Sequence, residues 1–163
     1  MGAGKILCII GGIITLATTF LLSFASDAIY YYYYIGLFQN IGDIFENADM
    51  DVIILTIVFI VVMLSGVLII LGVKSRVPSI IGGILAIVFA VYFILVGFDI
   101  LDITEIGKYV GVFAYDEALV ENIIPFDLPL GGGDFIEISL GTYLMLGGGV
   151  LGLIGGIMGP EGF

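Results

Sequence analysis

The stretch Leu140–Gly159, LGTYLMLGGGVLGLIGGIMG, decides how the rest of the chain folds. It carries no charge, and at about 1.5 Å per residue it is long enough to cross the roughly 30 Å hydrocarbon core of a bilayer as a helix. It contains eight glycines, each of which costs a helix in water roughly 1 kcal/mol relative to alanine. In a membrane, small residues let helix backbones approach closely, so this composition predicts a tightly packed membrane helix.

Four uncharged apolar runs predict an all-α membrane protein: a four-helix transmembrane bundle with a small extracytoplasmic subdomain. The predicted spans are residues 6–24, 52–73, 80–98 and 138–158. Residues 25–51 and 99–137 are then the outer loops of a single domain, 1–163. Hydrophobic residues make up 61% of the chain, well above the roughly 45–50% of a soluble domain. We expect the first span to be retained, because its apolar run is longer than that of a usual signal peptide.

Charged residues are distributed unevenly about these spans. Lys5, Lys74 and Arg76 lie on one side, which the positive-inside rule assigns to the cytoplasm together with both termini. Fourteen of the fifteen acidic residues fall in the outer loops, where Lys108 is the one cation, so the outer face carries a charge of about −13. The sequence therefore predicts a multi-pass protein of the cell membrane, with the lipid bilayer and no nucleic acid as partner.

Glycines are expected to form the contacts between the helices. A pair of glycines inside I-G-G-I recurs along the chain, and Gly148, Gly152 and Gly156 form two small-xxx-small steps on one helix face. At about 100° per residue, Gly155 and Gly159 begin a second face, which we expect to be available to another copy of the chain. The predicted packing residues are Gly11, Gly12, Gly66, Gly82, Gly83, Gly148, Gly152, Gly155, Gly156 and Gly159.

Both outer loops contain apolar and aromatic segments. Five consecutive tyrosines directly after the first span predict an interfacial aromatic belt, with rings among the lipid headgroups and hydroxyls in water; a recognition surface and a redox relay are alternatives. These are Tyr30, Tyr31, Tyr32, Tyr33 and Tyr34. In the second loop, residues 108–115 have a strand-like composition and residues 122–133 are extended. The apolar residues of the latter segment are expected to cover the bundle or to contact a partner: Ile123, Ile124, Phe126, Leu128 and Leu130.

The residues that are missing exclude several kinds of chemistry. The chain has no histidine and one cysteine, Cys8, which excludes Ser-His-Asp catalysis, an internal disulfide and His-ligated metal centres. We expect no cofactor. Asp99, Asp102 and Glu105 are candidate calcium ligands, although they form no EF-hand loop, and a solvated acidic face is the alternative. Tyr115-Asp116 with Gly131–Asp134 is similar to the paired motifs of intramembrane aspartic proteases, which need two facing carboxylates at membrane depth.

The order of the segments, with a short first loop, a tight cytoplasmic turn and a larger second loop, resembles tetraspanins and, more loosely, claudins. The resemblance is one of topology, because the Cys-Cys-Gly of tetraspanins and the Trp and cysteines of claudins are missing. The opening residues G-K-I-L-x-I-I-G-G-I are similar to the start of many archaeal membrane proteins. We expect a non-enzymatic structural unit or accessory subunit of a membrane complex, assembled with copies of itself or with other membrane subunits. The alternatives are an oligomeric pore and the aspartic protease.

Overall fold

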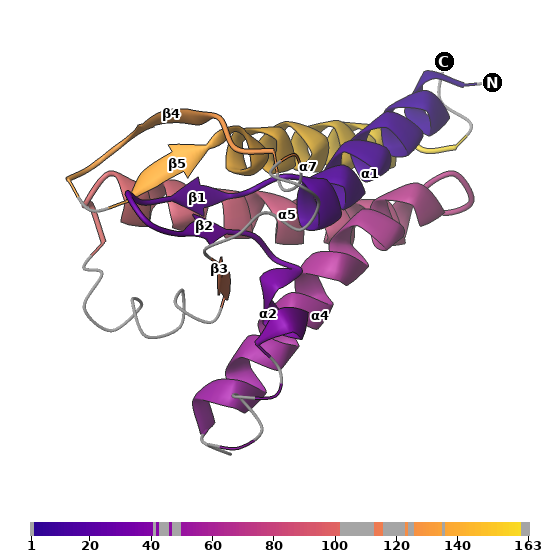
Figure 1. Cartoon of the computed structure of the whole chain (residues 1–163). Coiled ribbons are helices and arrows are strands. Elements are labelled where there is room, and N and C mark those ends of the chain that lie inside the picture. The colour runs from indigo at the N-terminus through magenta and orange to yellow at the C-terminus, as the bar shows by residue number, and fades with distance from the viewer. Residues whose placement is uncertain are drawn as a thin grey trace. The chain divides into compact units, whose positions relative to one another are not determined.

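The computed structural model describes residues 2–40, 42, 46, 50–101, 113–115, 123, 126–134 and 136–160. These residues form a mostly helical protein with a small antiparallel sheet (Figure 1). The helices are α1 (Ala3–Leu21), α2 (Gly36–Gln39), α4 (Met50–Leu71), α5 (Arg76–Gly97) and α7 (Leu140–Met158). The strands are β1 (Ala25–Ser26), β2 (Tyr31–Tyr32), β3 (Ala114–Tyr115), β4 (Pro129–Gly132) and β5 (Glu137–Ser139).

Three of these helices, α1, α5 and α7, are long and apolar enough to cross a membrane. The fourth long helix, α4, has 22 residues, and its second half, Ile60–Leu71, is a shorter apolar helical segment. Local chemistry explains where α5 begins and α7 ends. Pro78 lies in the first turn of α5, where backbone N–H groups have no partner within the helix. Gly159 adopts a φ of +76° and ends α7, a conformation that glycine adopts without strain.

The chain divides into two compact units. The helix unit consists of residues 1–18, 61–91 and 143–163, and the sheet unit consists of residues 19–60 and 92–142. Each unit therefore combines segments that are far apart in the sequence.

Burial along the helices repeats every three or four residues. In α1 buried residues recur in steps of four, three, four and three, at Gly4, Cys8, Gly11, Thr15 and Thr18, and Gly12 and Thr19 widen the buried face. The exposed isoleucines of the same helix, at 6, 10 and 13, keep the same spacing on the opposite side. An average period of 3.5 residues is typical of helices that pack side by side with a slight left-handed supercoil. The outer face of α1 is thus apolar, and its inner face carries small residues and hydroxyl groups.

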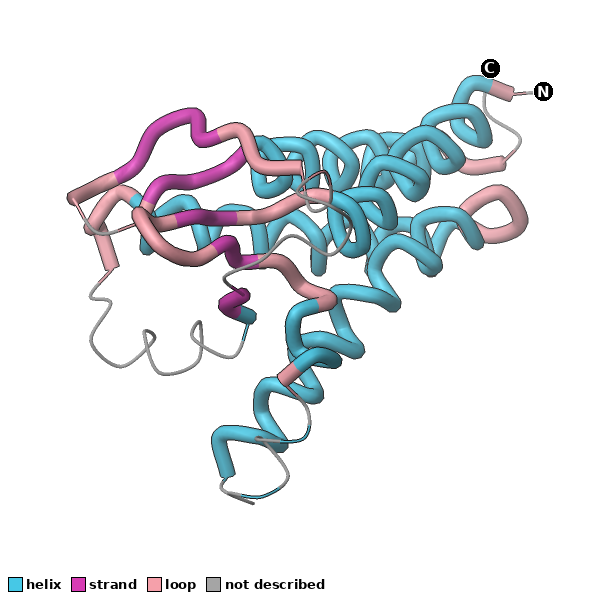
Figure 2. Tube along the Cα trace, viewed as in Figure 1, coloured by secondary structure: helices cyan, strands magenta, loops and turns pink. Residues whose placement is uncertain are grey.

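The sheet unit is built on five short strands in the order β3-β2-β1-β5-β4, each antiparallel to its neighbours (Figure 2). Strand β1 lies in the middle, where Ala25 pairs with Tyr32 on one side and with Ile138 on the other. The sheet thereby joins the residues after α1 to the residues before α7. The prediction of an all-α protein is wrong in this respect, because the outer loops supply a sheet as well as helical turns.

An aromatic cluster fills the core of the sheet unit. The Phe24 ring lies 4.6 Å from Tyr34, 4.5 Å from Phe93 and 5.7 Å from Phe113 between ring centroids. All four side chains are buried. Because Phe93 belongs to α5 and Phe24 directly precedes β1, the cluster attaches the sheet to the helical part of the same unit.

Candidate functional site

The paired glycines of α7 lie against two different helices. A methyl group on Gly148 would approach the Thr15 hydroxyl of α1 to 2.6 Å, and one on Gly155 would approach the Cys8 sulfur of α1 to 2.8 Å. The residue that follows each of them faces α5 instead. A methyl group on Gly149 would lie 3.0 Å from the Gly83 carbonyl oxygen, and one on Gly156 would meet Ile80 at 2.9 Å. Each of these distances is shorter than an ordinary van der Waals contact, so a larger residue would require the neighbouring atoms to shift.

The same division holds for the paired glycines of α1 and α5. Gly11 faces α7, where an added methyl group would lie 2.6 Å from the Gly148 carbonyl oxygen, whereas Gly12 faces Ile70 and Gly66 of α4. Likewise Gly82 faces α4 and Gly83 faces α7. Consecutive residues of a helix point about 100° apart. Each Gly-Gly pair therefore lets one helix approach two neighbouring helices closely, in directions about 100° apart around its axis.

This arrangement corrects the predicted helix faces. Gly148 and Gly156 do not share a face, and Gly152 lies against Ile69 of α4. Gly155 and Gly159 are buried within the chain, Gly159 beside the Arg76 guanidinium, so the face expected to be available to another copy is already covered. The prediction failed because the contacts repeat every seven residues, as at 148 and 155, rather than every four.

Buried hydroxyl and thiol groups of the helix unit are paired internally. The Ser79 hydroxyl donates to the carbonyl oxygen of Gly152 at 2.7 Å, so the Cys8 thiol, 3.2 Å from the Ser79 oxygen, is the donor of the second bond. Thr15 donates to the carbonyl oxygen of Gly11 at 2.8 Å. Among the described residues no buried side-chain nitrogen or oxygen lacks a partner.

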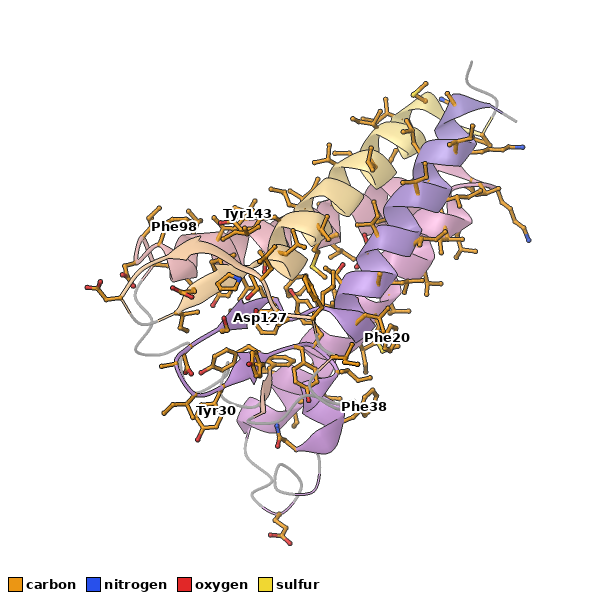
Figure 3. The ribbon with its side chains drawn as sticks, turned by 45° about the horizontal axis from the view of Figure 1, so that its top comes forward. Phe20, Tyr30, Phe38, Phe98, Asp127 and Tyr143 are labelled. Carbon is orange, nitrogen blue, oxygen red and sulfur yellow. The ribbon has the colours of Figure 1, made fainter. Side chains whose placement is uncertain are left out.

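In the sheet unit, Asp127, which Figure 3 labels, is hydrogen-bonded to two segments that are far apart in the sequence. Its carboxylate oxygen Oδ1 accepts hydrogen bonds from Ser23 at 2.6 Å and from Ser139. Ser23 follows α1, and Ser139 directly precedes α7. Both serines are fully buried, so a substrate has no access to these hydroxyls, and the arrangement acts as a clamp rather than a nucleophile with its base.

No motif in the sequence indicates this clamp. Asp127 lies between Phe126 and Leu128 in the extended second loop, where an acidic residue is expected to be exposed to solvent. The backbone around it is held as well, since Ser23 N–H donates to the carbonyl oxygen of Phe126 at 3.2 Å, and Phe126 N–H to that of Leu21 at 2.9 Å. Only the path of the loop past the end of α1 shows that a carboxylate there has two buried partners.

The tyrosine run has two environments. Tyr32, Tyr33 and Tyr34 are buried, and for these three the prediction of an interfacial belt is wrong, because the run turns into β2 and the aromatic core. Tyr30 and Tyr31 are exposed, and Tyr30 projects away from the ribbon (Figure 3). Burial in the aromatic core strongly raises the pKa of Tyr34, so its phenol stays protonated and serves packing.

Asp27 fixes the turn between β1 and β2. Its carboxylate accepts the N–H groups of Ile29 and Tyr30, each at 2.7 Å, and the Tyr32 hydroxyl at 2.8 Å. Burial by itself raises the pKa of Asp27, but the three hydrogen bonds outweigh it and lower the pKa below its ordinary value. Burial and the Asp27 carboxylate together raise the pKa of Tyr32. The charged form of Asp27 therefore stabilises the hairpin.

The candidate metal ligands and protease motifs are placed only in part. Asp99 is exposed, with a φ of +57° at the end of α5, while Asp102 and Glu105 lie outside the described residues. No group of three potential metal ligands occurs in the part of the chain that the structure describes. Asp134 is exposed, and Asp116 lies outside the described residues.

The sequence matches no protein-family model, and neither the curated proteins nor the solved structures give a match. The likeness to tetraspanins and claudins therefore remains one of segment order, and the functional argument depends on the chain's own residues.

Proposed function

We propose that this chain is a four-span membrane protein with a structural role, serving as an assembly unit or accessory subunit of a membrane complex. The observation that carries the proposal is the complete internal pairing of buried polar side chains among the described residues. Paths for ions or protons across a membrane usually need ionisable groups at membrane depth. Here the hydroxyls of Thr15, Ser65 and Ser79 are bound to backbone carbonyl oxygens, which occupies these polar groups within the bundle.

The surface of α4 supports its assignment as the fourth span. Its exposed apolar residues follow steps of four and three from one end to the other, at Ile53, Ile57, Ile60, Leu64, Val67 and Leu71. The exposed residues of α5 follow the same steps, at Val77, Ile81, Ile84, Val88 and Val91. A helix of 22 residues reaches about 33 Å at 1.5 Å per residue. A bilayer accounts for a continuous apolar stripe of that length, and four spans place both termini on one side, which Lys5, Lys74 and Arg76 assign to the cytoplasm.

The sheet unit provides the surface for other subunits. Ile29 at the β1–β2 turn is 68% exposed and Ile123 is 64% exposed, although both lie in segments outside the proposed spans. Three further apolar side chains of the second loop, Phe126, Leu128 and Leu130, are also exposed. Apolar surface in water indicates a contact partner. The partner is a second copy or another membrane subunit.

Reconstitution distinguishes this role from that of a pore. The purified chain in planar bilayers is expected to give no current above that of lipid alone, and native mass spectrometry is expected to show particles with more than one chain. Replacing Ile29 and Leu130 by serine should release single chains with an unchanged unfolding midpoint, whereas the matched change Ile13→Ser on α1 should leave the particles intact. Reproducible channel currents, or a wild-type particle with one chain and no partner, would overturn the proposal.

A further inference from the structure

The two units carry opposite charge. The helix unit contains Lys5, Lys74 and Arg76, and its described residues include no aspartate or glutamate; Glu161, its single acidic residue, lies outside the described residues. The other fourteen acidic residues and Lys108 belong to the sheet unit. The helix unit thus has a surplus of positive charge that the described part of the unit does not neutralise.

The three cations gather at one end of the helix unit. Arg76 begins α5, and its guanidinium lies beside Gly159 at the end of α7. Gly4, near the start of α1, contacts the carbonyl oxygen of the same Gly159. Lys5 follows Gly4, and Lys74 lies in the turn before Arg76, so all three belong to the end at which the N-terminus of α1 and the C-terminus of α7 meet (Figure 1). Lys74 and Arg76 are exposed.

Exposed apolar side chains directly adjoin these cations. Ile6 follows Lys5 and is 43% exposed, and Val77 follows Arg76 and is 62% exposed. One turn further along α5, Ile81 is also exposed. The combination of guanidinium and ammonium groups with an apolar surface beside them suits an amphiphile whose anionic head lies on the cations and whose chains lie on the helices. A free phosphate ion would contact only the cations and not the apolar side chains beside them.

We propose that this end of the helix unit binds the headgroups of anionic phospholipids. The surplus positive charge favours lipids with a net negative charge over zwitterionic ones, although both contain a phosphate. The inference rests on α1 and α5 lying in a bilayer and is independent of the proposed assembly role, so it can fail while that role stands, and the reverse also holds.

The test uses the full chain in detergent micelles doped with phosphatidylglycerol or phosphatidylcholine, with the unfolding midpoint as readout. Phosphatidylglycerol is expected to raise the midpoint, and added salt should reduce the rise. Each cation near an anionic surface contributes about fivefold to binding. Lys74→Gln should therefore raise the half-saturating phosphatidylglycerol concentration about fivefold, and the double variant Lys5→Gln, Lys74→Gln should raise it about 25-fold.

The control variant is Lys108→Gln, which removes the same charge from the sheet unit and should leave the half-saturating concentration unchanged. Each variant is compared with its own midpoint in phosphatidylcholine, which separates lipid binding from any loss of basal stability. Equal effects of the two lipids, or an equal loss in Lys108→Gln and Lys74→Gln, would overturn the proposal. A midpoint raised as much by inorganic phosphate would also overturn it, because the site would then be one for free anions.

Discussion

Alanine substitutions at the neighbouring residues Gly147 and Gly148 are expected to change stability in opposite directions. Both glycines lie inside α7, so the gain in helix propensity, up to about 1 kcal/mol, is common to both. A methyl group on Gly147 meets nothing within 4 Å. A methyl group on Gly148 would lie 2.6 Å from the Thr15 hydroxyl oxygen and 2.8 Å from the Gly11 carbonyl oxygen.

The contacts at Gly148 cannot adjust cheaply. The Thr15 hydroxyl is hydrogen-bonded to that same Gly11 carbonyl, so moving it breaks the bond, and the carbonyl itself can retreat only if α1 moves away from α7. Overpacking of this kind costs about 1–3 kcal/mol. After subtraction of the propensity gain, Gly148→Ala should lose up to about 2 kcal/mol, whereas Gly147→Ala should gain about 0.4–1 kcal/mol.

Cys8 provides the assay, because it is the only cysteine and is fully buried. A thiol-reactive dye that becomes fluorescent on labelling reports unfolding in detergent as Cys8 becomes accessible. At about 2–4 °C per kcal/mol, Gly148→Ala should lower the midpoint by up to about 8 °C, and Gly147→Ala should raise it by about 1–4 °C. Equal midpoints for the two variants would refute the assignment of Gly148 to the contact between α1 and α7.

Two further predictions concern the sheet unit. Asp127→Ala should destabilise the protein by about 1–3 kcal/mol, because the buried Ser139 hydroxyl loses its acceptor and the Ser23 hydroxyl keeps only its 3.4 Å bond to the Phe126 carbonyl oxygen. Asp127→Asn keeps an oxygen and should cost less; equal losses in chemical unfolding would contradict the clamp. Because the pKa of Asp27 is lowered in the folded state, its charge stabilises the fold above the ordinary aspartate pKa of about 3.9 and ceases to do so as the pH falls through the folded value. The difference in midpoint between wild type and Asp27→Asn should therefore be largest near pH 7 and shrink below about pH 4, and a difference independent of pH would exclude the charge as its cause.

The amino-acid sequence by itself determined the helices of this protein. Uncharged apolar runs of spanning length leave the backbone few alternatives to the helix, and the observed ends of α1, α4, α5 and α7 lie within four residues of the predicted spans. The sequence also marked glycine as the residue of the helix contacts. Both results depend on local properties, namely hydrophobicity, length and side-chain size, which can be read without knowing which segments meet.

Only the tertiary structure decided which neighbour each contact residue meets. Gly155 appeared available to another copy, yet it packs on Cys8 of α1. Contacts with α1 repeat every seven residues along α7, at Gly148 and Gly155, and the glycine that follows each of them meets α5 instead. Tyr34 and Asp127 appeared to be surface residues, yet one lies in an aromatic core and the other holds Ser23 and Ser139 together. The residues that contact Gly155, Tyr34 and Asp127 are more than 50 residues away in the sequence or lie across a strand pairing. No local sequence pattern specifies such long-range contacts. Strands of two to four residues are likewise too short to show an alternating hydrophobic pattern in the sequence. The sheet therefore becomes visible only in the structure, where the two loops pair with each other.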